Sequence, residues 1–395
     1  MNAVTLPQPD PDALQHSARL QAMIHDEIAA AGGAISFARF MALALYAPGL
    51  GYYSAGAHKL GAAGDFVTAP ELSPLFGQCL ARQCREVLQR LGGGDILEFG
   101  AGSGALAAEV LLTLEALDCL PRTYAILDLS ADLRARQRET LSARAPHLLS
   151  RVKWLDQLPE TGFRGVVLAN EVLDAMPVHL LRYAGAGFEE LRVICEGEGL
   201  GWRGEPIRDG TLAAHAQALE KELGDGVFCP GYTTEINLAA EGWVNGVASF
   251  LEAGLCLIID YGFPRREYYH PDRRDGTLMC HYRHHAHDDP LAMVGLQDIT
   301  AHVDFTAVAE QALAAGLEVA GYTSQAHFLL GCGLGALLAG ADPSDTRRYL
   351  TLTQQVKKLT LPQEMGELFK VLALRRGLEG PLMGFSIQDR RSALG

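Results

Sequence analysis

The fold is decided by the stretch Asp95-Ile96-Leu97-Glu98-Phe99-Gly100-Ala101-Gly102-Ser103-Gly104. A short apolar run ends in a carboxylate and a glycine-rich turn, and an Ala/Leu/Glu-rich helical pattern follows over about 104–118. Strand, glycine turn and helix in this order are how an α/β sheet presents backbone N–H groups to a nucleotide-like ligand. Gly100, Gly102 and Ala105 also satisfy a relaxed dinucleotide fingerprint, so the glycines alone do not choose the ligand.

Glu98 narrows the choice of ligand. It precedes the first glycine by two residues, where its negative charge would repel the diphosphate of a dinucleotide. S-adenosylmethionine carries a sulfonium and an ammonium instead of phosphate, and a carboxylate suits both cations. The sequence therefore favours a methyl donor over NAD at this turn. The competing interpretation, a tight turn that only joins strand to helix, explains the glycines and leaves Glu98 without a purpose.

The composition is that of an ordinary globular protein and excludes two classes of partner. The chain has 395 residues, 48% of them hydrophobic, and a formal net charge of −14. Because nucleic acids and anionic membranes require a basic surface, we expect neither as a partner. A basic protein or peptide partner is compatible with the charge, and a solvated acidic surface that only aids solubility is the other interpretation. A homodimer also remains open.

The cysteines and the N-terminus bear on location. The eight cysteines are dispersed without a C-x-x-C motif, and several stand in apolar surroundings, which predicts reduced core residues. No stretch reaches the roughly 18 apolar residues of a membrane span, and the N-terminal residues lack the pattern of a targeting peptide. We therefore expect a cytoplasmic enzyme.

Alternating strand and helix patterns predict an α/β fold with a parallel sheet and right-handed crossovers. The expected strands are 95–99, 123–128, 151–155, 165–169 and 255–260, with later helices near 304–315, 325–339 and 344–358 and strands at 317–322 and 368–374. We expect a helical N-terminal extension with a glycine-rich lid loop over 1–90 and a core over 91–374. Inserts at about 185–250 and 261–300 would face the substrate, and 375–395 would form a C-terminal tail.

Polar residues that follow the strands are the candidates for ligand contacts, because ligands bind at the carboxyl ends of parallel strands. Asp128 ends the second strand and can accept both ribose hydroxyls, with Leu129 beside it. Capping of the helix that opens at Ala131 is the alternative role, which Ser130 fills equally well. After the third strand, Asp156 could accept the adenine amino group while Leu155 covers the base, and a plain surface loop is the other interpretation.

The fourth strand ends abruptly in Asn170-Glu171-Val172-Leu173-Asp174, beside the position where a donor methyl would project. An arginine acceptor is difficult to methylate, because its guanidinium is protonated and its electrons are delocalised. Carboxylates could hold it by two hydrogen bonds and draw the charge toward the nitrogen that does not react. Asn170, Glu171 and Asp174 are therefore the candidates for the acceptor site. Capping of a following helix by Asn170 and Glu171 is the alternative.

Two further segments have polar groups that could act on ligands. Asp65, Phe66, Thr68 and Glu71 lie in a stretch that could close over the cofactor as a lid, or could be an irregular connector with capping acids. A second segment contains His281, His284, His285, His287, Asp288 and Asp289. Because it lacks a helical H-E-x-x-H motif, it favours a solvated loop or substrate contacts over a zinc site, and we expect no metal.

Seven segments together resemble the MidA-like class I methyltransferases. They are Gly51-Tyr52-Tyr53, Gly64 to Glu71, Leu97 to Gly104, Asn170 to Val178, Asp260-Tyr261-Gly262, Gly276-Thr277-Leu278 and Gln297 to Phe305. The glycine motif is shared by many methyltransferases, whereas the Asn170 and Asp298 segments are more particular to this group. The resemblance covers about residues 35 to 374.

The resemblance implies a Rossmann-like class I methyltransferase sheet, S-adenosylmethionine as donor and a protein arginine as acceptor. Mitochondrial members of the family assist respiratory complex I assembly by methylating an arginine of a subunit, so such a subunit is an expected partner. The predicted catalytic residues are Asn170, Glu171, Asp174 and Asp65. The predicted cofactor-binding residues are Glu98, Gly100, Ala101, Gly102, Gly104, Asp128, Leu129, Leu155, Asp156, Phe66 and Thr68.

Three other functions remain open from the sequence. A non-catalytic assembly factor could keep the cofactor fold as a docking scaffold. A methyltransferase could act on a small molecule if the two inserts closed a narrow pocket. An NAD-linked oxidoreductase is disfavoured by Glu98.

Overall fold

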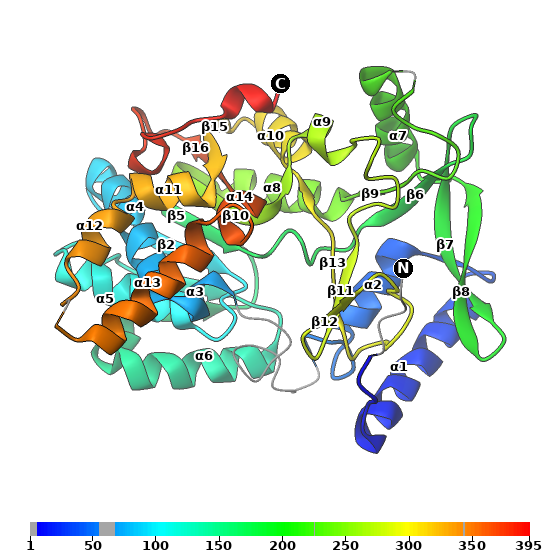
Figure 1. The fold of residues 1–395 in the computed structure, drawn as a ribbon, viewed down its shortest axis with the longest axis horizontal. Helices are drawn as coiled ribbons and strands as arrows, with labels where there is room; N and C mark the ends of the chain where they lie inside the picture. Colours follow the sequence, from blue (N-terminus) through cyan, green and yellow to red (C-terminus); the bar gives the residue numbers. More distant parts are fainter. Residues whose placement is uncertain (1–5, 55–67, 225, 343) are drawn as a thin grey trace. The chain divides into compact units, whose positions relative to one another are not determined.

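Figure 1 shows the fold in a computed structural model of the chain, which describes residues 6–54, 68–224, 226–342 and 344–395. The chain divides into two compact units. Unit 1 comprises Met1–Phe66, Asp174–Gly242 and Arg265–Val303, and unit 2 comprises Val67–Leu173, Trp243–Pro264 and Asp304–Gly395. Both units therefore combine stretches that lie far apart in the sequence.

Unit 2 contains the sheet that the sequence predicts, in the strand order β15-β16-β10-β5-β2-β3-β4. Its strands are β2 (Asp95–Phe99), β3 (Tyr124–Leu127), β4 (Val152–Leu155), β5 (Phe163–Asn170), β10 (Leu251–Phe263), β15 (Glu318–Ser324) and β16 (Phe369–Arg376). The strands from β10 to β4 pair in parallel, whereas β16 and β15 are antiparallel to their neighbours. The predicted α/β class is confirmed, with an antiparallel extension at one side.

The register of the sheet brings the ends of its parallel strands level with one another. Phe99 of β2 pairs with Leu127 of β3 and with Ala169 of β5. Asn170 of β5 in turn pairs with Ile259 of β10. The residues that follow these positions therefore share one edge of the sheet, the edge at which such sheets bind ligands.

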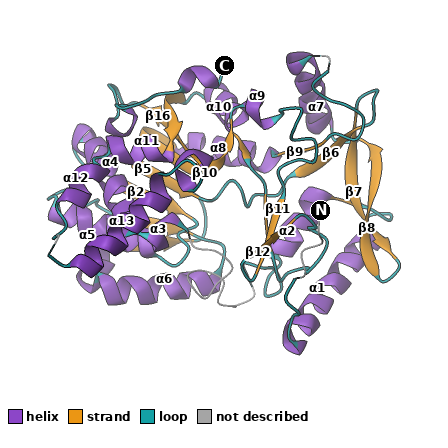
Figure 2. Cartoon of the chain, viewed as in Figure 1, coloured by secondary structure: helices purple, strands orange, loops and turns teal. Residues whose placement is uncertain are grey.

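Helices bury both faces of this sheet (Figures 1 and 2). They include α3 (Ala69–Leu72), α4 (Pro74–Leu91), α5 (Ala105–Ala116), α6 (Ala131–Arg144), α10 (Phe305–Ala314), α11 (Gln325–Gly331), α12 (Leu334–Ala339), α13 (Thr346–Thr360) and α14 (Met365–Leu368). Ile96 and Leu97 are consecutive in β2, so their side chains point to opposite faces, and both are 0% exposed. Coverage on both faces explains why the strands read as continuous apolar runs.

Unit 1 is built around antiparallel sheets. Strands β1 (Ile35–Ser36), β7 (Phe188–Glu196), β6 (His179–Tyr183) and β9 (Thr233–Ile236) pair in that order, and β8 (Gly199–Pro206) pairs with β7. A second sheet has the order β12 (His285–His287), β11 (Met279–Tyr282) and β13 (Asp298–Thr300). Helices α1 (Pro11–Ala30) and α2 (Phe37–Tyr46) share one apolar core with these strands. Ser36 caps α2 by accepting a hydrogen bond from the Arg39 N–H.

The remaining elements complete the chain. They are α7 (Gly210–Leu223), α8 (Leu238–Phe250), α9 (Arg265–Tyr268) and β14 (Val303–Asp304). The N-terminal helices and most of the two expected inserts belong to unit 1, whereas α4 and the C-terminal residues belong to unit 2. None of the eight cysteines forms a disulfide. Among the described residues, no helix is long and apolar enough to cross a membrane.

Candidate active site

The turn between β2 and α5 exposes backbone donors at the carboxyl edge of the sheet. Gly100, Gly102 and Gly104 have φ angles of 59°, 52° and 84°, a left-handed conformation that glycine adopts without strain. The N–H groups of Ala101, Gly102 and Ser103 make no hydrogen bond to another described residue. No side chain caps α5, so its first N–H groups also remain available to a ligand.

Gly104 also allows a close approach between helices. A Cβ atom at this position would lie 3.0 Å from the Cα atom of Gln137 in α6. The Gln137 side chain, which is fully buried, donates from Nε2 to the Gly102 carbonyl oxygen at 3.2 Å. The turn is therefore held in place from outside by a residue that the sequence analysis did not select.

Glu98 lies in β2, two residues before Gly100, and is 3% exposed. Its Oε2 atom accepts a hydrogen bond of 2.6 Å from the hydroxyl of Tyr124. Burial raises the pKa of Glu98 to about 7, the Tyr124 hydrogen bond opposes this rise, and the nearby charge of Asp128 adds to it. The carboxyl group is thus poised to ionise near neutral pH, and its contact with a cationic ligand stays a prediction.

Asp128 follows β3 and is 6% exposed. Its Oδ1 atom accepts from the Ser130 N–H at 2.9 Å, and its Oδ2 atom accepts from Gln137 Nε2 at 2.8 Å. Burial raises the pKa of the Asp128 carboxyl. Helix α6 is capped by Ser130, which accepts from the Leu133 N–H, so the capping role considered for Asp128 is wrong. The ribose role stays a prediction.

The predicted adenine contacts lie on the next strand and its loop. Leu129 is 78% exposed, Leu155 is half-buried, and the side chain of Asp156 is 89% exposed. Arg134 joins this region by pairing with Asp156 at 2.6 Å and by donating to the Leu155 and Asp128 carbonyl oxygens. Asp156 therefore has a structural partner in Arg134, and the adenine contacts of Leu155 and Asp156 stay predictions.

Beyond β5, the chain makes a strained turn. Glu171 has a φ of 52°, a region that residues with a side chain rarely adopt. Asn170, which is 9% exposed, donates from Nδ2 to Glu171 Oε1 at 3.0 Å. No helix begins at residues 171–177, so the helix-capping alternative for these two residues is wrong.

The other predicted catalytic and lid residues are distributed differently. Asp174 belongs to unit 1, where it is 5% exposed and its carbonyl oxygen accepts from the Ala301 N–H at 2.9 Å. Asp65 and Phe66 lie outside the described residues. Thr68 precedes α3 and makes no capping hydrogen bond with its side chain. In α3, Glu71 has a buried Oε2 atom without a hydrogen-bond partner among the described residues.

Comparison with known proteins decides the class of cofactor that the chain uses. Residues 79–323, more than half of the chain, match the family model described as "Putative S-adenosyl-L-methionine-dependent methyltransferase". The chain belongs to this methyltransferase family. The matched range contains the glycine turn, Asp128 and the β5 turn.

Solved structures agree with this assignment. A crystal structure of a protein from Burkholderia thailandensis bound to S-adenosyl-homocysteine is 50% identical, with a TM-score of 0.93, and the match covers 98% of this chain and 100% of that one. A native crystal structure from the same organism is 49% identical with a TM-score of 0.91, again over 98% and 100% of the two chains. The predicted class I methyltransferase fold, enzyme class and S-adenosylmethionine cofactor are confirmed.

Curated relatives span nearly the same length. The zebrafish (Danio rerio) protein named protein arginine methyltransferase NDUFAF7, mitochondrial, is 28% identical over 87% of this chain and 84% of its own. The human (Homo sapiens) protein of that name is 27% identical over 87% and 80%. The predicted resemblance to the MidA-like family, as relatives of the mitochondrial arginine methyltransferase, is confirmed.

The histidine-rich segment of this methyltransferase forms a hairpin in unit 1. Tyr282 pairs with His285, and the two turn residues Arg283 and His284 have φ angles of 47° and 64°. Nearby, Tyr53 donates to Asp298 Oδ1 at 2.8 Å, and its pKa is raised chiefly by burial and then by Asp298. The described residues contain no group of three or more His, Cys, Asp or Glu side chains that could hold a metal ion.

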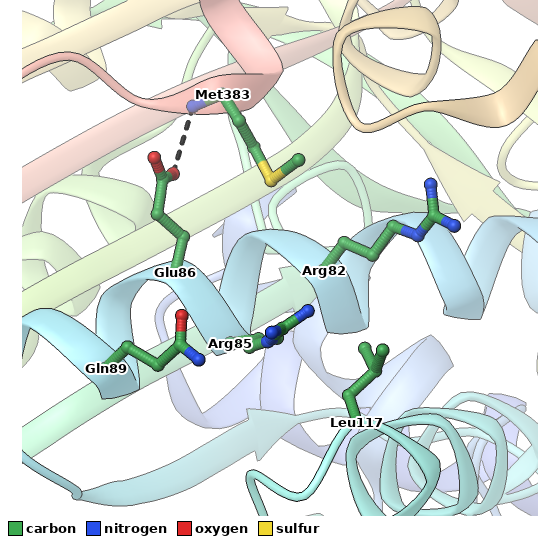
Figure 3. A pocket seen from close by; sticks show the side chains of 6 residues that line it. All are labelled: Arg82, Arg85, Glu86, Gln89, Leu117 and Met383. Atoms are coloured by element: carbon green, nitrogen blue, oxygen red, sulfur yellow. Dashed lines mark hydrogen bonds between the residues drawn. The ribbon is translucent and has the colours of Figure 1, made fainter. Parts of the chain in front are cut away.

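Figure 3 shows a pocket of about 460 Å³ beside α4, in unit 2 of the methyltransferase. Its lining residues are Arg82, Arg85, Glu86, Gln89, Leu117 and Met383. Glu86 is already bound to the Met383 N–H at 3.0 Å and to Arg90. Arg82 donates to the carbonyl oxygens of Cys332 and Gly333. None of the predicted site residues lines this pocket.

Proposed function

We propose that this methyltransferase N-methylates an arginine side chain of a protein partner. The observation that supports it most is the pairing of a buried amide, Asn170, with the carboxylate of Glu171 at the end of β5. Strand β5 is the direct neighbour of β2, whose carboxyl end leads into the glycine turn. The names of the zebrafish and human relatives support the same acceptor class.

The chemistry explains why a carboxylate is needed next to the donor. When bound, S-adenosylmethionine supplies an electrophilic methyl group on a positively charged sulfur. Glu171 would hold the guanidinium by charge-assisted hydrogen bonds and concentrate its positive charge away from the reacting nitrogen. Methyl transfer would form an N–C bond and break the S–C bond of the donor, S-adenosylhomocysteine would be the leaving group, and the proton lost from the nitrogen would pass to solvent. The carboxylate therefore lowers the barrier by orientation and electrostatics.

The proposal extends to the partner and its location. By resemblance to the MidA-like family, a subunit of respiratory complex I is the first acceptor to test. The net charge of −14 is compatible with a basic acceptor segment. Cytoplasmic location is part of the proposal, although the relatives above are named as mitochondrial.

The test is to incubate the purified enzyme with a cell lysate and methyl-labelled S-adenosylmethionine, and to locate the label by mass spectrometry. We expect label on arginine in a defined protein, and much less of it at subsaturating donor when an Asp128→Ala enzyme replaces the wild type. Label on another side chain or on a small molecule would overturn the arginine assignment. Tight S-adenosylhomocysteine binding without any labelled acceptor would instead support a non-catalytic assembly factor.

A further inference from the structure

Asp260 holds the turn that contains Glu171. Asp260 lies in β10, directly after Ile259, the last residue of this strand that pairs with β5, and is 0% exposed. Its Oδ2 atom accepts from the backbone N–H groups of Val172 at 3.2 Å and Leu173 at 2.9 Å. Its Oδ1 atom accepts from the Tyr261 N–H at 3.0 Å. One buried carboxylate therefore fixes the two peptide groups that follow Glu171.

The backbone on the other side of Glu171 is fixed as well. The Glu171 N–H donates to the Ile259 carbonyl oxygen at 2.9 Å, which continues the pairing of β5 with β10. Glu171 thus has a left-handed conformation between two anchored segments. Such a conformation is unfavourable for glutamate and persists only where surrounding contacts enforce it.

Unit 1 contains the same arrangement with a different residue at the strained position. Gly276 has a φ of 81°, and the N–H groups of the next two residues, Thr277 and Leu278, donate to Glu235 Oε1 at 2.9 and 3.3 Å. Glu235 is 2% exposed. A buried carboxylate that holds two successive N–H groups is therefore compatible with a strain-free glycine before them. Position 171 has glutamate instead. A glycine there would remove the backbone strain, but it would also remove the carboxylate.

A cation stands opposite Asp260. In the antiparallel pair of β10 and β16, Asp260 is the register partner of Lys370, which is 6% exposed. Residues paired in this way project to the same face of the sheet. Lys370 Nζ also donates to the Leu368 carbonyl oxygen at 3.3 Å and lies 5.4 Å from the centre of the Phe263 ring. The pairing therefore places a buried amine and a buried carboxyl side chain on the same face of the sheet.

We propose that Asp260 is a positioning residue for methyl transfer, which holds Glu171 in its left-handed conformation and thereby sets the place of its carboxylate. This inference rests on the proposed role of Glu171. A residue that acts in this way changes the rate of the chemical step and leaves the affinity for the cofactor unaltered.

The experiment is a double-mutant cycle on turnover with the acceptor that the labelling identifies. We expect Asp260→Asn to lower kcat about 10- to 100-fold, because an amide has one acceptor oxygen in place of two, so its NH2 group must face N–H groups that a carboxylate oxygen now accepts. In a Glu171→Gly background, Asp260→Asn should cause less than a further twofold loss, because the residue through which it acts is gone. Additive losses in the cycle would overturn the proposal.

Two controls separate positioning from folding. Glu235→Gln weakens the equivalent contact in unit 1 and should leave kcat within about twofold. The affinity for S-adenosylhomocysteine, measured by calorimetry, should be the same for wild type and Asp260→Asn, and a parallel loss of affinity and kcat would contradict the proposal. If Asp260→Asn does not fold, Asp260→Glu keeps the charge and displaces its oxygens, and unchanged kcat in that variant would also contradict it.

Failure of this proposal is distinguishable from failure of the proposed function. The cycle can be measured on any acceptor that receives label, so a labelled lysine or small molecule would overturn the arginine assignment and leave the cycle intact. Amide hydrogen exchange at Val172 and Leu173 gives a readout without turnover, and Asp260→Asn should accelerate exchange at both. Unchanged exchange at these two amides would overturn the positioning role alone.

Discussion

The turn after β2 and the turn after β5 lie at the same edge of the sheet but are built in opposite ways. In the first, glycines adopt the left-handed conformations and the N–H groups of Ala101 to Ser103 bond to no other described residue. In the second, Glu171 adopts such a conformation and Asp260 occupies the N–H groups that follow it. A turn with open N–H groups suits ligand binding by the backbone, whereas a turn with occupied ones presents side chains.

The largest effect should come from the side chain that the second turn presents. Glu171→Gln removes the charge that would hold and polarise a guanidinium, so we expect kcat to fall by about 100- to 1000-fold. The affinity for S-adenosylhomocysteine should change less than about threefold. Steady-state kinetics on the labelled acceptor, with calorimetry in parallel, measure both. Retained turnover would remove Glu171 from the acceptor site.

The first turn should show the opposite pattern. Gly104→Ala places a Cβ atom 3.0 Å from the Gln137 Cα atom and forces alanine into a left-handed conformation, so the turn must shift. We expect the affinity for S-adenosylhomocysteine to fall about 100-fold.

Gly92→Ala is the matched control for that substitution. Gly92 ends α4 with a φ of 69° and has open space around its Cβ position. The control should destabilise the fold by about 1 kcal/mol in thermal unfolding and leave the affinity unchanged. Equal affinity losses in both variants would mean that the glycine turn has no special part in binding.

Substitutions at Asp128 and Asp156 compare the effect on cofactor affinity of a buried carboxylate with that of a surface ion pair. We expect Asp128→Ala to weaken S-adenosylhomocysteine binding by about 10- to 100-fold through the loss of charge-assisted hydrogen bonds to ribose. Asp156→Ala removes an exposed partner of Arg134 and should weaken it by about threefold at most. Unchanged affinity in Asp128→Ala would show that the ribose assignment is wrong.

The smallest expected effect is a pH dependence of donor binding. Since burial raises the pKa of Glu98 to about 7, its carboxyl is mainly neutral below that pH and ionised above it. If the ionised form attracts the cationic donor, the affinity for S-adenosylmethionine should rise about tenfold from about pH 6 to about pH 8. Calorimetry across this range should show a smaller rise for S-adenosylhomocysteine, which lacks the sulfonium charge. A flat profile would separate Glu98 from donor binding.

The pH dependence of the free energy of unfolding provides an independent check on Glu98. A carboxyl whose folded pKa exceeds its unfolded value of 4.5 favours the neutral form in the fold. The contribution of Glu98 to the free energy of unfolding therefore falls as the pH rises from 4.5 to about 7, and it stays low above that range. Glu98→Gln should lessen this decline in denaturant unfolding of the ligand-free protein.

The glycine turn at the carboxyl edge of the sheet could be predicted from the sequence, because its signals are local. Strand β2, the glycine turn and α5 are consecutive in the chain, so their hydrophobic periodicity and turn residues predict them. The ends of β3 and β5 follow from their apolar runs. These features required only near neighbours in the chain.

The side chains that hold the two turns in place could not be predicted from the sequence, because they contact the turns across long stretches of the chain. Asp260 is 88 residues from Val172 in the sequence, and Gln137 is 35 residues from the Gly102 carbonyl oxygen that it binds. No periodic pattern in the sequence predicts a buried glutamine in the middle of a helix, or a carboxylate that accepts hydrogen bonds from a distant turn. The membership of Asp174 in unit 1 likewise depends on contacts with residues such as Ala301.

The central claim is that the glycine turn after β2 binds the cofactor and that the Glu171 turn after β5 supports the chemical step. Its most direct test compares Gly104→Ala with Asp260→Asn in one paired experiment. S-adenosylhomocysteine calorimetry and single-turnover methyl transfer at saturating donor would be measured on both proteins. We predict that Gly104→Ala loses affinity and keeps most of its rate once saturated, and that Asp260→Asn keeps affinity and loses rate. The reverse pattern, or one shared loss in both variants, would contradict the account.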